Sequence, residues 1–119
     1  MSLHYFSDEE IKGLDKEFSA KLDMARKESG VPYVITSGLR VQGDNSTVGG
    51  VQDSAHLQGK AVDLRSGDST THFAIVRGAI LAGFNRIGVY HDAEGKPSHC
   101  HLDNSAELPQ GVLWIGKSH

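Results

Sequence analysis

Two short clusters in the sequence contain side chains that could bind a metal ion. In residues 54–63, SAHLQGKAVD, a histidine (His56) and an aspartate (Asp63) lie seven positions apart. In HCH, two further histidines (His99 and His101) flank a single cysteine. Imidazole and carboxylate groups are the nitrogen and oxygen ligands of zinc in many proteins. The two clusters together could therefore form one metal site.

The second cluster predicts which side chains would face a metal. In an extended strand His99, His101 and Asp103 lie on one face, and Cys100 lies on the other. A free cysteine packs like a small apolar residue, so we expect Cys100 in the core. Asp103 could hold a ligand histidine from behind. Two protein ligands from the first cluster and one histidine from the second leave an open position, which is the pattern of a catalytic zinc site.

The other histidine of this strand would lie about 6–7 Å from the ligand histidine on the same face, since successive residues of a strand rise about 3.3 Å each. That position suits a general acid or base acting on a water held by the metal. The first cluster alone is more often an ordinary solvated loop histidine with a strand-end aspartate, and the second alone is equally compatible with a polar strand face. The hypothesis of a metal site therefore depends on the two clusters together.

The composition limits the other function classes. A chain of 119 residues predicts one domain, residues 1–119. A net charge of −3 gives no indication of a nucleic-acid partner. The sequence has no apolar run of the roughly 18 residues that a membrane helix needs, so no membrane insertion is expected. The single cysteine excludes an internal disulfide.

The elements that must position these residues follow from periodicity and from turn residues. Apolar residues at spacings of three and four predict two helices, and alternating or β-branched runs predict strands. The expected order is a helix over 7–30, a strand over 33–36, a long irregular loop over 37–54, a strand over 60–65, a helix over 66–83, a hairpin of strands 86–90 and 98–103, and a short strand over 111–116. This order predicts an α+β fold with the helices on one face of a small, largely antiparallel sheet.

The apolar spacing also predicts which helix residues are buried. In the first helix these residues are Ile11, Leu14, Phe18, Leu22 and Ala25. In the second they are Phe73, Val76, Ile80, Leu81 and Phe84. His72 stands in the first turns of the second helix, where a positive charge is unfavourable, so we expect it to be neutral and exposed.

The first cluster also resembles a family motif. SAHLQGKAVD matches, at every defined position, the SxHxxGxAxD motif of the zinc peptidoglycan peptidases of the D-Ala-D-Ala carboxypeptidase group, whose fold the hedgehog signalling domain shares. SGLR, GFNRIGVY, HCHLD and a late tryptophan are similar to further family motifs and occur in the family's order. The resemblance covers residues 34–114, and it implies the hedgehog/DD-peptidase fold.

The resemblance assigns a role to each matching residue. It implies one zinc ion held by His56, Asp63 and His101. It also implies an arginine, Arg40, that binds substrate and stabilises the developing oxyanion, and a motif serine, Ser54, close to bound substrate. Many relatives carry a carboxylate shortly before the third ligand as catalytic base, and this chain has none there. We therefore assign the acid/base role to His99.

The expected function is that of a zinc metallopeptidase acting on D-amino-acid-containing stem peptides of bacterial peptidoglycan, as a D,D-carboxypeptidase or an endolysin-like endopeptidase. The alternative is a non-catalytic zinc-binding module or a phage structural or cell-wall-binding component. A third interpretation is that no metal binds. We expect a monomer that is made in the cytoplasm without a visible signal peptide and reaches the cell wall if released or exported.

Overall fold

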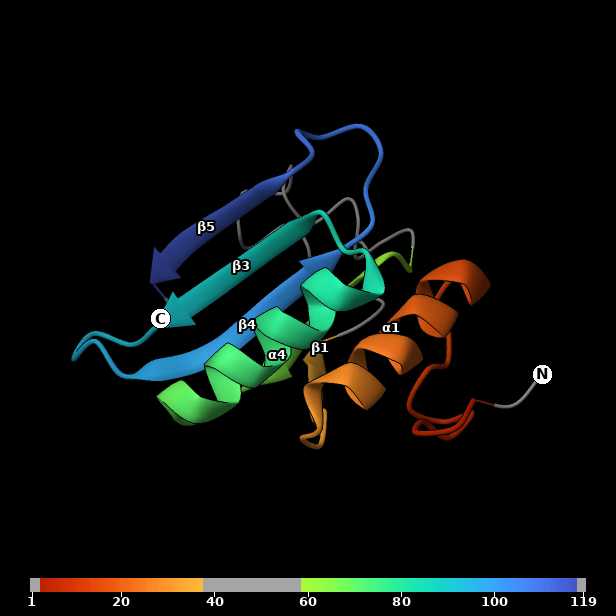
Figure 1. The fold of residues 1–119 in the computed structure, drawn as a ribbon, viewed down its shortest axis with the longest axis horizontal. Coiled ribbons are helices and arrows are strands. Elements are labelled where there is room, and N and C mark those ends of the chain that lie inside the picture. The colour runs from red at the N-terminus through yellow and green to blue at the C-terminus, as the bar shows by residue number, and fades with distance from the viewer. Residues whose placement is uncertain (1–2, 38–58, 118–119) are drawn as a thin grey trace.

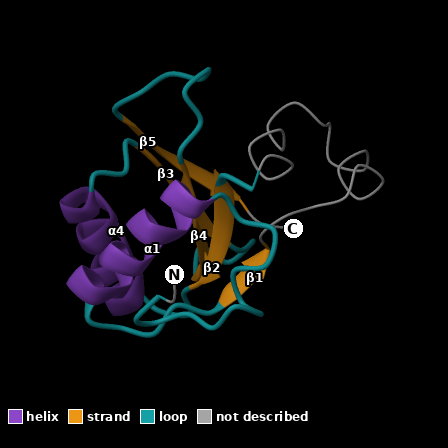
Figure 2. Cartoon of the chain, turned by 90° about the vertical axis from the view of Figure 1, so that its right-hand side faces the viewer, coloured by secondary structure: helices purple, strands orange, loops and turns teal. Residues whose placement is uncertain are grey.

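The structure, a computed structural model, describes residues 3–37 and 59–117. In this part of the chain two helices cover one face of a five-stranded sheet (Figures 1 and 2), as the predicted fold class requires. The elements are α1 (Lys16–Ser29), β1 (Ile35–Ser37), β2 (Ala61–Arg65), α4 (Ser69–Ala82), β3 (Arg86–His91), β4 (Pro97–Asp103) and β5 (Val112–Lys117).

The strand order is β1-β2-β4-β3-β5. Three of the neighbouring pairs are antiparallel, and only β5 runs parallel to its neighbour β3. The predicted hairpin of β3 and β4 is confirmed. Its turn is held by Asp92, whose carboxylate accepts hydrogen bonds from the backbone amides of Glu94 and Lys96 at 2.9 Å each.

Helix α1 begins later than the predicted range 7–30. Ser7 and Glu10 do form the reciprocal hydrogen bonds of a capping box, at 2.9 and 3.2 Å. They stabilise an isolated turn instead of the helix, because Gly13 follows with a φ of 85° and breaks the helical path. The helix begins after Asp15, whose side chain caps its first turn.

The predicted buried set of the second helix is only partly right: Phe84 is in the core and Val76 packs against it, but the other three residues are exposed. Phe73, Ile80 and Leu81 are 69%, 58% and 54% exposed. The buried residues are instead His72, Ile75, Gly78 and Ala79. The cause is the close approach of α1, since a Cβ at Gly78 would overlap the side chain of Ser29 and the backbone of Ala25. Small residues are therefore required where the two helices meet.

The core lies between the helices and the sheet. Phe18 of α1 meets Phe84 edge to face, with ring centroids 5.7 Å apart. Cys100 and Leu102 of β4 are fully buried against the helices, which confirms the predicted core position of the cysteine. Because side chains alternate along a strand, the intervening residues of β4 face the opposite side of the sheet.

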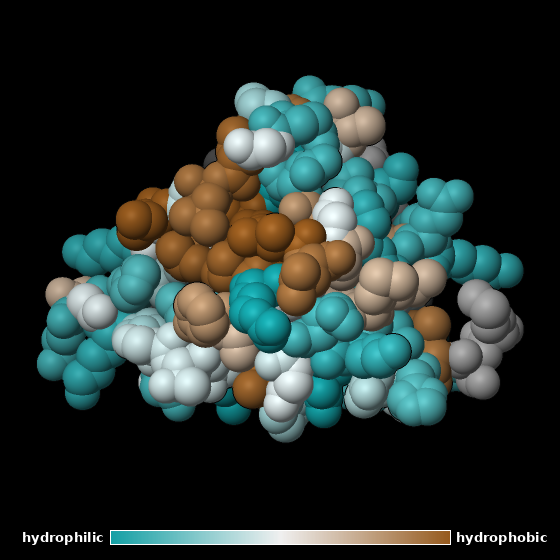
Figure 3. All heavy atoms as spheres, viewed as in Figure 1, coloured by the Kyte–Doolittle hydropathy of each residue, from teal (hydrophilic) through white to brown (hydrophobic). Residues whose placement is uncertain are grey.

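Apolar side chains also remain on the helix-covered side of the molecule (Figure 3). Phe73 and Ile80 of α4 and Leu113 and Ile115 of β5 are all more than half exposed. No helix in the described part of the chain is long and apolar enough to cross a membrane.

Candidate metal centre

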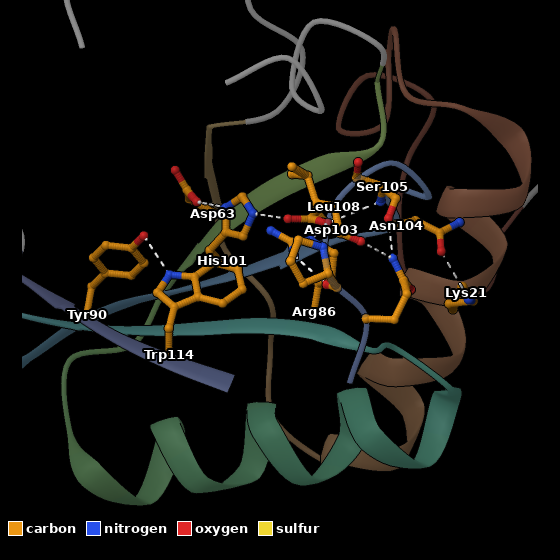
Figure 4. Close-up of polar contacts among 12 residues, drawn as sticks. Lys21, Asp63, Arg86, Tyr90, His101, Asp103, Asn104, Ser105, Leu108 and Trp114 are labelled. Atoms are coloured by element: carbon orange, nitrogen blue, oxygen red, sulfur yellow. Dashed lines mark hydrogen bonds and ion pairs between the residues drawn. The ribbon is translucent and has the colours of Figure 1, made fainter. Parts of the chain in front are cut away.

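The register of β2 and β4 brings two of the predicted metal ligands together. Asp63 is the direct antiparallel partner of His101, although the two residues are far apart in the sequence. Asp63 Oδ1 lies 3.0 Å from His101 Nδ1 (Figure 4). Both side chains lie on the face of the sheet that the helices leave uncovered. The predicted convergence of the two clusters is therefore present for this pair.

The second nitrogen of His101 is also fixed. Its Nε2 lies 2.6 Å from Asp103 Oδ2, so that the imidazole is held between two carboxylates. Burial by itself would lower the pKa of His101, but the hydrogen bonds to Asp103 and Asp63 outweigh it and raise this pKa to about 9. Burial would raise the pKa of Asp103, yet its bonds to His101, Ser105 and Arg86 keep that pKa below its ordinary value.

This arrangement fits a zinc ion. Neighbouring donors of a tetrahedral zinc with bonds of 2.0–2.2 Å lie about 3.3–3.6 Å apart, and the Oδ1 and Nδ1 atoms here are slightly closer, at 3.0 Å. Ligand histidines commonly donate their other N–H to a carboxylate, as His101 Nε2 can to Asp103. Asp63 and His101 could therefore both act as ligands of a zinc ion.

The remaining predicted zinc ligand, His56, lies outside the described residues. The same holds for Arg40 and Ser54, the two predicted substrate-binding residues. Among residues 3–37 and 59–117, no group of three or more histidine, cysteine or carboxylate side chains is arranged to hold a metal. The described pair is thus only part of the predicted ligand set, whose third member is His56.

His99 lies on the same strand as His101, two residues earlier. Its ring stacks on Tyr90 of β3, with centroids 4.4 Å apart and planes 9° from parallel. Its Nδ1 lies 3.2 Å from Ser98 Oγ. Burial lowers the pKa of His99, and the nearby His101 adds to this while Asp63 opposes it. The ring is therefore neutral at neutral pH and can accept a proton.

An aromatic wall stands beside these histidines, formed by Tyr90 and Trp114. The indole N–H of Trp114 donates to Tyr90 Oη at 2.9 Å. The indole lies 5.5 Å from the His101 ring, between centroids. Glycine makes room for both rings: a Cβ at Gly88 would lie 2.6 Å from the Trp114 ring, and a Cβ at Gly116 would overlap Tyr90.

Replacing Gly88 with alanine should therefore disturb the wall. We expect Gly88→Ala to destabilise the protein by about 1–3 kcal/mol, the usual range for overpacking, and to alter the fluorescence of the chain's one tryptophan. Gly67→Ala is a matched control, because a Cβ there meets nothing within 4 Å. Urea unfolding followed by tryptophan fluorescence measures both effects. Equal stability of the two variants would contradict this packing.

His72 is buried, which corrects the expectation that it is exposed. Only 8% of its surface is accessible, and its Nδ1 lies 2.6 Å from Ser66 Oγ on the helix side of the sheet. Burial and the neighbouring His91 lower the pKa of His72, which favours the neutral ring. His72 does not reach the metal centre, because Cys100 and the sheet separate them.

Arg86 is a residue of the site that the sequence analysis missed. Its Nε donates to Asp103 Oδ1 at 2.7 Å, and its Nη1 donates to the carbonyl of Pro109 at 2.7 Å (Figure 4). One signal could have revealed it. Arg86 opens the first strand of the predicted hairpin and Asp103 closes the second, so an antiparallel register pairs them.

Comparisons with known proteins give the family and the fold of the chain. The sequence profile of the peptidase M15 family matches residues 4–103, a range that includes every predicted site residue. Among solved structures, the chain is similar to the L-Ala D-Glu endopeptidase ChiX of Serratia marcescens, with 24% sequence identity and a TM-score of 0.52. The alignment covers 81% of this chain and 85% of that chain, and the likeness shows a shared fold. No curated protein matches the chain.

Proposed function

Because the chain belongs to the peptidase M15 family, we propose that it is a zinc-dependent peptidase that cleaves stem peptides of bacterial peptidoglycan. The observation that carries this proposal is the contact between Asp63 Oδ1 and His101 Nδ1, with His101 Nε2 held by Asp103. This is the donor set and the orientation that a zinc ligand pair requires.

Each residue has a proposed role. Asp63 and His101 would hold zinc together with His56, and the bound ion would supply a Lewis acid for the scissile carbonyl and for a water. His99, neutral and on the same strand face, would accept and return the proton. Arg40 would bind a substrate carboxylate or the oxyanion through its planar fork of donors, and Ser54 would contact the substrate.

The substrate class is proposed from the family and from the similar structure. ChiX is an L-Ala D-Glu endopeptidase, so we propose the bond between L-alanine and D-glutamate as the first to test. Cleavage of a terminal D-alanine, as by a D,D-carboxypeptidase, is the second. Both bonds lie in the bacterial cell wall, so the protein would act there after release or export.

The proposal is tested with the purified full-length chain. Elemental analysis should give about one zinc per chain, as a single site of this type requires. Purified muropeptides incubated with the zinc form should yield products whose masses identify the bond that was cut. The metal-chelated protein should yield none until zinc is restored.

Two results would reject the proposal in different ways. Zinc bound at one equivalent with no cleavage of any muropeptide would favour the alternative of a non-catalytic zinc-binding module. Absence of zinc after growth in zinc-supplemented medium would reject the metal site itself.

A further inference from the structure

Arg86 links the proposed zinc ligand His101 to the aromatic wall. Its Nε donates to Asp103 Oδ1, while the other oxygen of Asp103 faces His101 Nε2. Its guanidinium carbon lies 5.1 Å from the centre of the Trp114 ring. One side chain therefore contacts both the carboxylate behind the ligand and the tryptophan beside it (Figure 4).

Burial makes the contact with Asp103 more important than a surface ion pair. The side chains of Arg86 and Asp103 are 11% and 2% exposed. A carboxylate removed from water in this way must be paired and hydrogen bonded to remain charged. Arg86 forms a direct ion pair with Asp103, with Nε 2.7 Å from Oδ1.

The contacts also fix the orientation of the carboxylate. Asp103 Oδ1 accepts from Arg86 Nε at 2.7 Å and from the backbone N–H of Ser105 at 3.1 Å. With Oδ1 held by two donors, Oδ2 is directed at His101 Nε2. That bond turns Nδ1 toward Asp63.

We propose that Arg86 is a positioning residue for zinc binding: it holds the Asp103 carboxylate in one orientation, and thereby presents His101 Nδ1 to the metal beside Asp63. This inference rests on the proposed zinc function. It adds a residue that the motifs of the sequence did not single out.

Lysine would satisfy only part of this role. The guanidinium places Nε on Asp103 and Nη1 on the Pro109 carbonyl, and its face covers Trp114. A lysine ammonium supplies the charge without the fixed fork or the flat face. Arg86→Lys therefore separates the effect of charge from that of orientation.

The test measures zinc affinity by competition with a chelator for folded wild-type protein and four variants: Arg86→Gln, Arg86→Lys, Asp103→Asn and the double variant Arg86→Gln/Asp103→Asn. We expect Arg86→Gln and Asp103→Asn each to weaken zinc binding about 10- to 100-fold, the usual effect of losing such a partner. Arg86→Lys should lie between Arg86→Gln and the wild type. The double variant should bind zinc no more weakly than Asp103→Asn, because Arg86 acts through Asp103.

The double variant also guards against misfolding, since it removes both buried charges together. Arg77→Gln is the matched control: Arg77 lies on α4 and donates to the Glu28 carbonyl on the helix side, so zinc affinity should not change. Unaltered zinc affinity in Arg86→Gln, or losses in the two single variants that multiply in the double variant, would overturn the proposal.

A zinc-free measurement keeps this inference separate from the proposed function. In the metal-free wild type, the proton shared by His101 Nε2 and Asp103 should give a downfield imidazole N–H signal in NMR spectra of histidine-labelled protein. The signal should weaken or move in Arg86→Gln and stay in Arg77→Gln. If the wild type binds no zinc, the proposed function fails, and an unchanged signal in Arg86→Gln would then overturn the positioning role as well.

Discussion

His99→Gln is expected to lower kcat about 100- to 10,000-fold, the usual contribution of a general acid or base, while one zinc stays bound. Glutamine keeps a polar side chain of similar reach but cannot accept and return a proton at neutral pH. His99 faces the same side of the sheet as His101 but is not one of the proposed ligands, so its loss should spare the metal. Muropeptide turnover and zinc content, measured on the same preparation, check both parts.

Asp63→Ala is the control for this experiment. It removes a proposed ligand, so zinc content and activity should fall together. A His99→Gln variant with wild-type kcat would show that another group transfers the proton. Loss of zinc in that variant would show instead that His99 is a ligand.

Zinc affinity is expected to rise about 50-fold between about pH 7 and pH 9, because each pH unit below the pKa of a ligand costs a factor of ten and the ligand is half protonated at its pKa. The direction of this pH dependence follows from the pKa of His101. Asp103 and Asp63 raise its metal-free pKa to about 9, and zinc must displace the proton on Nδ1. Proton competition therefore weakens binding at every pH below about 9 and ends above it.

Competition with a chelator of known protonation constants at several pH values measures this dependence. An ordinary histidine ligand, with a pKa near 6.5, would leave the affinity flat above about pH 7. Asp103→Asn removes one of the two carboxylates that raise the pKa of His101, so its profile should level off at a lower pH. A flat wild-type profile would contradict the raised pKa.

The fold class and the facing of β4 were predictable because both depend on strong local patterns. Alternation along β4 placed Cys100 in the core and His101 opposite it, as observed. The match of the peptidase M15 profile to residues 4–103 confirms the family that the SxHxxGxAxD motif indicated. The roles of His56, Arg40 and Ser54 stay predictions, since these residues lie outside the described ranges.

The errors arose where tertiary packing decides between local alternatives. Helix α4 carries apolar residues on more than one side, and the predicted buried side was the one that includes Phe73 and Ile80. The contact with α1 instead requires Gly78 at the interface and leaves Phe73 and Ile80 exposed. His72 is buried for the same reason, because it lies on the face of α4 that also buries Ile75 and Ala79.

The start of α1 was misplaced and the role of Arg86 was missed for other reasons. A capping box forms at Ser7 with or without a helix behind it, and the positive φ of Gly13 is not visible in the apolar spacing. Arg86 was missed because its role depends on pairing the first residue of one predicted hairpin strand with the last residue of the other, a pair that the motifs do not single out.

Gly88 and Gly116, the two glycines that make room for the aromatic wall, also affect how β3 and β5 align. Gly88 pairs with Trp114, and Tyr90 pairs with Gly116, so each strand offers a glycine where the other offers an aromatic ring. Sliding β5 by two residues would keep the same faces but set Trp114 beside Tyr90 and leave Gly88 without a ring to cover it. The pairing of a glycine with an aromatic residue at both positions thus favours the observed register of β3 and β5 over the register shifted by two residues. This register also determines the shape of the site, because it places the indole of Trp114 beside His101.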